Sequence, residues 1–109
     1  MKDVKFYREL ANGKSLSFLI SYSKGRGIYA HFTEVKVTYE RGFRCEQWDV
    51  FGDPSQRVLL ERVTRGSQKK VDDWAARIER IADDIVELWN EKCYNTAATA
   101  IFNSVAVTV

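Results

Sequence analysis

Few side chains in this sequence have both the chemistry and the spacing of a catalytic or metal site. His31 is the single histidine, and the two cysteines, Cys45 and Cys93, lie far apart in the chain. One imidazole and two distant thiols do not give the ligand spacing of a zinc site, so we predict no bound metal. A lone histidine inside a predicted strand is more often packed or exposed than catalytic.

The glycines and carboxylates do not form a catalytic motif either. Gly25-Arg26-Gly27 lacks the third glycine and the strand-turn-helix context of a dinucleotide site. The sequence has no Gly-x-Ser-x-Gly elbow and no phosphate-binding loop. Asp72-Asp73 and Asp83-Asp84 are adjacent in sequence, but neighbours on a helix point about 100° apart and do not converge on one substrate atom. We therefore predict that the protein is not an enzyme and has no catalytic residue and no cofactor.

A group of aromatic and basic residues gives a clearer indication of binding. If Leu16, Phe18 and Ile20 face a helix, alternation along the strands gives the opposite sheet face several aromatic side chains. The candidate partner-binding residues are Tyr7, Lys24, Arg26, Tyr29, His31 and Trp48. One interpretation is an aromatic platform for a partner. The other is a curled, barrel-like core that takes up some of these side chains, or a strand whose alternation is off by one.

An aromatic platform suits two kinds of partner. Tyrosine and tryptophan dominate the energetics of protein interfaces, and aromatic side chains also stack on single-stranded bases. Several basic residues would suit phosphate contacts in the second case: Lys5, Arg8, Lys14, Lys24, Arg26, Arg41, Arg44 and Arg57. Lys24 and Arg26 lie in a glycine-flanked loop that would reach a nucleic-acid backbone, although a plain hairpin explains the same loop.

Composition and charge describe a globular chain near neutrality. The 109 residues are 45% hydrophobic and 29% charged, which fits a single α+β domain over residues 1–109. A net charge of +2 is too small to imply nucleic acid by itself. No apolar run is long enough to span a membrane, and the N-terminus has no signal-peptide core. We expect a cytoplasmic protein with reduced cysteines, a lone disulfide being the alternative.

The longest periodic stretch, from Ser67 to about Tyr94, predicts one long amphipathic helix with Ser67 as its N-cap. Apolar residues recur in it at alternating spacings of three and four: Val71, Trp74, Ile78, Ile81, Ile85 and Leu88. Such a helix would be roughly 40 Å long, whereas a seven-residue strand spans about 23 Å. Unless the helix is broken, one end overhangs the sheet and needs the C-terminal segment or a second subunit to cover it.

The residues before this helix predict an antiparallel meander of about five strands. The expected strands are Val4–Leu10, Leu16–Ser23, Ile28–Tyr39, Phe43–Phe51 and Arg57–Thr64. Asn12-Gly13 is a strong hairpin signal between the first two. In the third strand the apolar residues change face near Thr33-Glu34, which predicts a β-bulge or a bend. Residues 95–102 fit either a continuation of the helix or a second short helix, and residues 105–109 fit either a frayed tail or a terminal edge strand.

These elements predict an α+β fold, an antiparallel meander of about five strands followed by one long C-terminal amphipathic helix packed on one sheet face. For the function we expect a non-catalytic macromolecule-binding protein, a stand-alone inhibitor or accessory factor of the phage or mobile-element type. It would dock on a partner protein and not on a membrane, and a homodimer is a further expectation. The alternative is a single-stranded nucleic-acid-binding protein that uses the aromatic and basic sheet face.

Overall fold

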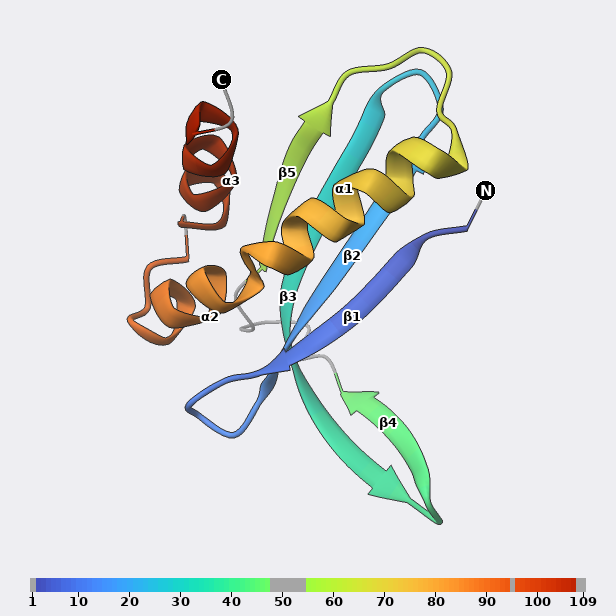
Figure 1. Ribbon diagram of the computed structural model, residues 1–109. Coiled ribbons are helices and arrows are strands. Elements are labelled where there is room, and N and C mark those ends of the chain that lie inside the picture. Colours follow the sequence, from blue (N-terminus) through green and yellow to red (C-terminus); the bar gives the residue numbers. More distant parts are fainter. Residues whose placement is uncertain (1, 48–54, 95, 108–109) are drawn as a thin grey trace.

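Figure 1 shows the computed structural model, which describes residues 2–47, 55–94 and 96–107. In these residues the strands come first and the helices last, which confirms the α+β class. The strands are β1 (Val4–Glu9), β2 (Ser15–Ser23), β3 (Gly27–Glu40), β4 (Phe43–Gln47) and β5 (Ser55–Glu61). The helices are α1 (Gln68–Arg80), α2 (Ala82–Asn90) and α3 (Thr96–Val107).

The strands form an antiparallel sheet built around β3. β2 pairs with β1 along one edge and with residues 27–35 of β3 along the other. β5 pairs with residues 28–33 of β3, and β4 pairs with residues 36–40. The predicted β1–β2 hairpin is confirmed, since the Leu10 N–H donates to the Lys14 carbonyl at 2.9 Å across the Asn12-Gly13 turn. The first half of β3 therefore belongs to the main sheet, and its second half belongs to a two-stranded hairpin.

Alternation along the strands places the hydrophobic core on one face of the sheet. Leu16, Phe18 and Ile20 are fully buried there, as predicted, beneath the helices. The Phe18 ring stacks on Phe6 with 4.7 Å between centroids and meets Phe32 edge-on at 5.3 Å. α1 and α2 cover this face with six buried side chains: Val71, Ala75, Ile78, Ala82, Ile85 and Trp89.

The prediction of one long helix is wrong, because the helical segment is broken at Ile81. Ile81 has φ −103° and ψ 7°, and its N–H donates to the Ile78 carbonyl at 3.1 Å, a tighter turn than that of an α-helix. The apolar spacing of three and four continues through the break, so the periodicity does not reveal it. Because α1 and α2 each bury a face against the core, a helix overhang no longer argues for a second subunit.

The helical region begins at a side-chain N-cap and ends in a separate third helix. Ser67 is the N-cap of α1, as predicted, and its Oγ accepts from the Lys70 N–H at 3.2 Å. α3 packs on α2 and β5 and buries Ala97 and Ile101. The structure adopts the second of the two alternatives for residues 95–102, a separate helix. Residues 105–107 belong to this helix and not to an edge strand, and residues 108–109 lie outside the described residues.

Of the β-bulge or bend predicted near Thr33-Glu34, the bulge is wrong. The β2–β3 register runs without a shift through both residues, and the shift that β3 does show lies between Ile28 and Tyr29, opposite β5. The alternation of side chains is therefore continuous at Glu34. The apolar residues change face because Glu34, a charged residue, occupies a position on the helical face and is only 5% exposed.

The carboxylate of Glu34 is held by one residue from α2 and one from the β1–β2 turn. The Trp89 Nε1–H donates to Glu34 Oε1 at 2.8 Å, and the Lys14 Nζ lies 4.0 Å from Glu34 Oε2. A buried carboxylate needs such partners, since burial without them costs several kcal/mol. The hydrogen bond between Trp89 and Glu34 therefore joins the end of α2 to the middle of β3.

We predict that Trp89→Phe lowers the free energy of unfolding by about 2–4 kcal/mol, because it removes a hydrogen bond to a buried charge and leaves a small cavity. Urea denaturation measures the effect. Glu34→Leu removes the other partner, so the double variant should cost less than the sum of the two single variants. Strictly additive costs would show that this hydrogen bond contributes nothing.

Gly27 begins β3 in close contact with the backbone at the end of β5. Its φ is +134°, and a Cβ there would meet the Glu61 carbonyl oxygen and lie 3.0 Å from the Arg62 Cα. Gly25, in the preceding turn, has φ +80° but has nothing within 4 Å of a Cβ. Of the glycines in the described part of the chain, only Gly27 therefore combines a glycine conformation with a closed space.

We predict that Gly27→Ala lowers the free energy of unfolding by about 2–4 kcal/mol, since backbone strain and overpacking add. Gly25→Ala is the matched control and should cost about 1 kcal/mol, the conformational term alone. Thermal or urea denaturation of the two variants compares them. Equal effects would mean that β3 and β5 do not approach each other tightly at Gly27.

Candidate functional site

The predicted partner-binding residues of β1 and β3 lie on the sheet face turned away from the helices, here called the outer face. Tyr7 follows Phe6, which packs against the core, and Tyr29 and His31 flank the buried Ala30. Alternation therefore directs all three side chains away from the core. Each is half-buried, so the outer face carries the aromatic residues that the sequence predicts for it.

Tyr7 is covered by cationic side chains. The Cζ of Arg44 lies 3.8 Å from the centroid of the Tyr7 ring, and the Nζ of Lys5 lies 5.3 Å from it. A guanidinium at this distance is held by attraction to the ring face and by stacking. Arg44 belongs to β4, where it is opposite Tyr39. The β3–β4 hairpin thus brings a charge to a residue of β1.

Tyr29 is covered in the same way by Arg57 of β5, whose Cζ lies 4.2 Å from the ring centroid. Arg57 is also opposite His31 in the β3–β5 ladder. Burial, and secondly the positive charge of Arg57, hold the pKa of His31 below its ordinary value. His31 is therefore neutral at pH 7, and its Nε2 lies 3.3 Å from the Thr33 Oγ1.

The aromatic platform is divided between these two groups. Thr33 and Tyr7 are both opposite Ser17, so Tyr7 is level with Thr33, and Tyr29 is four residues further along β3. That separation is roughly 13 Å along the strand. Ser17 and Thr33, which are level with Tyr7 on the two neighbouring strands, are 2% and 5% exposed.

The other predicted residues are not brought to either group. Lys24 and Arg26 are exposed in the loop between β2 and β3. The Arg26 N–H closes this loop by donating to the Ser23 carbonyl at 3.0 Å. Trp48, and with it residues 48–51 of the predicted fourth strand, lie outside the described residues.

The β3–β4 hairpin projects beyond the sheet and away from the helices (Figure 1). We call residues 36–47 the arm. Arg41 and Gly42 at its turn have φ of 51° and 82°, as in a type I′ turn, which matches the right-handed twist of the two strands. Tyr39 and Phe43 flank this end of the arm and are 71% and 75% exposed. The arm thus presents two large aromatic side chains to solvent.

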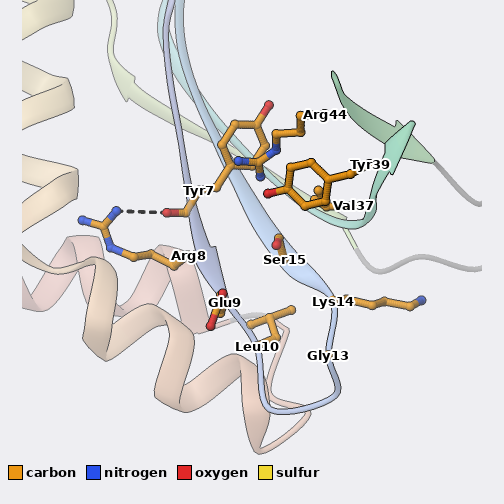
Figure 2. Close-up of a pocket in the computed structure, with 10 residues that line it drawn as sticks. All are labelled: Tyr7, Arg8, Glu9, Leu10, Gly13, Lys14, Ser15, Val37, Tyr39 and Arg44. Carbon is orange, nitrogen blue, oxygen red and sulfur yellow. Dashed lines mark hydrogen bonds between the residues drawn. The ribbon is translucent and has the colours of Figure 1, made fainter. Parts of the chain in front are cut away.

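A groove of about 540 Å³ lies where the arm meets β1 and β2. Figure 2 shows the side chains of Tyr39 and Arg44 turned toward Tyr7 across it. The lining residues are Tyr7, Arg8, Glu9, Leu10, Gly13, Lys14, Ser15, Val37, Tyr39 and Arg44. We call this space the arm groove.

The cations of the arm groove differ in how far they are already paired. Arg8 points to the helices, with Nη2 3.5 Å from Glu79 Oε1 and Nε 4.0 Å from Asp83 Oδ1. Its Nη1–H also donates to the Tyr7 carbonyl at 3.0 Å (Figure 2). Lys14 is held by the buried Glu34 carboxylate. Arg44 has no carboxylate within ion-pair distance among the described residues.

Sequence reasoning missed the residues of the arm as a site. Tyr39, Phe43 and Arg44 belong to predicted strands. The change of face near Thr33-Glu34 lies close to the point at which β3 leaves the main sheet, but it does not single these residues out. The Arg41-Gly42 turn is the one signal that points to them, because a two-residue turn there places Tyr39 opposite Arg44. Alternation then directs both side chains to the outer face.

Other features and the comparisons with known proteins add no further site. Among the described residues, no group of three or more histidine, cysteine, aspartate and glutamate side chains could hold a metal ion. Cys45 and Cys93 are not joined by a disulfide. None of the helices that the structure describes is long and apolar enough to cross a bilayer. The chain matches no protein-family model, no curated protein and no solved structure.

We predict that His31 makes the stability of the fold depend on pH. Its pKa is lower in the folded chain than in the unfolded one, so the unfolded chain binds more protons as the pH falls. The free energy of unfolding should therefore decrease as the pH is lowered from about 7 to about 5. His31→Gln should remove this part of the decrease. Urea denaturation across this range tests it, and identical pH profiles for the two proteins would contradict it.

Proposed function

We propose that this chain is a non-catalytic binding protein that docks on another protein through its arm. The observation that carries the proposal is the exposure of Tyr39 and Phe43 on a hairpin that projects from the sheet. A role as a stand-alone inhibitor or accessory factor of the phage or mobile-element type fits a small chain built in this way. The proposed place of action is the cytoplasm, where thiols such as those of Cys45 and Cys93 stay reduced.

Physical reasons favour an interaction role for the arm. An isolated two-stranded hairpin is marginally stable in water, so a projecting one contributes little to the core. Tyr39 and Phe43 would gain more free energy from a partner's surface than from water, because aromatic side chains bury a large apolar area. Aromatic residues and arginine are also the types that contribute most at protein interfaces. The arm carries both, since Arg44 follows Phe43 near its turn.

Binding of single-stranded nucleic acid is the second candidate function. It is supported by the cations of the outer face, Lys5, Arg44 and Arg57, which would suit phosphate contacts. The same geometry also weakens the case for nucleic-acid binding. Arg44 and Arg57 already cover ring faces of Tyr7 and Tyr29, so a base that stacked on those faces would have to displace a guanidinium. We therefore rank protein binding first.

We predict that Phe43→Ala and Tyr39→Ala each weaken the capture of a protein from the native host by at least about tenfold, as expected for central aromatic residues of an interface. Phe102→Ala is the matched control, because Phe102 is 73% exposed but lies on α3. Affinity capture with nuclease treatment, quantified by mass spectrometry, measures the effect. Circular dichroism verifies that the variants are folded.

Two outcomes would contradict the proposal. Capture that disappears on nuclease treatment would favour nucleic acid, and capture that is equal for the arm variants and for Phe102→Ala would exclude the arm. A second copy of this chain is another candidate partner. Light scattering identifies that case, since Phe43→Ala would then turn a dimer into a monomer.

A further inference from the structure

We infer that the arm groove binds an acidic side chain of the partner protein, with Arg44 as its receptor. This inference rests on the proposed function and assigns the chemistry of the partner. Its starting point is that Arg44 is exposed and has no carboxylate partner among the described residues, whereas Arg8 and Lys14 of the same groove are already paired. Among the described cations that line the groove, Arg44 is therefore the one with free hydrogen-bonding capacity, and it lies beside Tyr39, an exposed aromatic residue of the arm.

The position of Arg44 prepares it for a carboxylate. Its guanidinium lies 3.8 Å from the centroid of the Tyr7 ring, and the ring limits the side-chain rotamers that it can adopt. Stacking uses one flat side of the group and leaves its N–H edges available. Those edges match the two oxygens of a carboxylate in a bidentate pair. Less conformational entropy is then lost on binding than for a freely moving arginine.

Neighbouring groups favour a peptide carboxylate over a nucleic acid. Glu9 also lines the groove, next to Leu10 and roughly 7 Å along β1 from Tyr7, so a polyanion that followed the groove would meet a negative charge. A single acidic side chain at Arg44 avoids Glu9. Leu10 and Val37 supply an apolar lining for the residues beside that side chain. The expected ligand is therefore a short segment that combines acidic and apolar residues.

Two other places in the molecule give weaker grounds for a binding site. A smaller pocket near Trp89 and Tyr94 contains the Glu34 carboxylate, but Trp89 and Lys14 already bind both oxygens. The outer edge of β5 would accept another strand, but nothing in the structure shows what covers it. The arm groove is the place where an uncommitted charge, a concave surface and an exposed aromatic residue, Tyr39, coincide.

The test uses a fluorescent peptide of alternating aspartate and leucine, the same peptide with asparagine for aspartate, and an oligothymidylate of equal length, at physiological salt. Arg44→Gln should weaken binding of the acidic peptide by at least about tenfold, and Arg44→Lys by less, because lysine keeps the charge but loses the planar fork. Arg41→Gln is the matched control, since it removes the same charge from the turn of the same hairpin. It should change the affinity by less than about twofold.

Several results would overturn the inference. They are binding of the asparagine peptide as tight as that of the aspartate peptide, equal losses in Arg41→Gln and Arg44→Gln, saturable binding of the oligothymidylate alone, or no binding of any probe. The capture experiment then separates this inference from the proposed function. If Phe43→Ala abolishes capture and Arg44→Gln leaves it intact, docking through the arm stands and the acidic-ligand inference fails. If neither variant affects capture, docking through the arm fails.

Discussion

The hydrogen bond between Trp89 and Glu34 is the contact on which the arrangement of helices and strands depends. Glu34 occupies a position on the helical face where Ile28, Ala30 and Phe32 are apolar, so its carboxylate must find partners inside the protein. Trp89 supplies an N–H at 2.8 Å from the last turn of α2. This fixes where α2 ends relative to β3. The main sheet continues one residue past Glu34, to the buried Val35, and the arm begins after it.

Much of this fold could be predicted from the sequence, because its local signals and the core agree. The alternation of Leu16, Phe18 and Ile20 along their strand identifies the face that packs on the helices, and the sequence predicts the turn at Asn12-Gly13. The helix break could not be predicted in the same way. Ile81 keeps the spacing of apolar residues, and its backbone differs for a tertiary reason, the fit of two short helices to the sheet.

The sequence could predict the residues of the candidate site only where strand alternation alone determines which face of the sheet a side chain is on. Tyr7, Tyr29 and His31 could be placed on the outer face because each alternates with a core residue along its strand. Their separation into two groups depends on register, and the cations that cover them come from other strands, Arg44 from β4 and Arg57 from β5. A single sequence does not give the cross-strand pairs that bring such residues together.

Charge is distributed unevenly between the strands and the helices, and the charged side chains of the two parts have different roles. Residues 1–66, which include the strands, carry twelve basic and eight acidic side chains, and residues 67–109 carry five and seven. On the helical side, the acidic residues Glu79 and Asp83 are used to hold Arg8, which itself caps a carbonyl of β1. This cap blunts one edge of the sheet against pairing with another strand. On the outer face, Arg44 has a tyrosine ring beneath it and no described carboxylate beside it, so this surface retains the capacity to bind an anion.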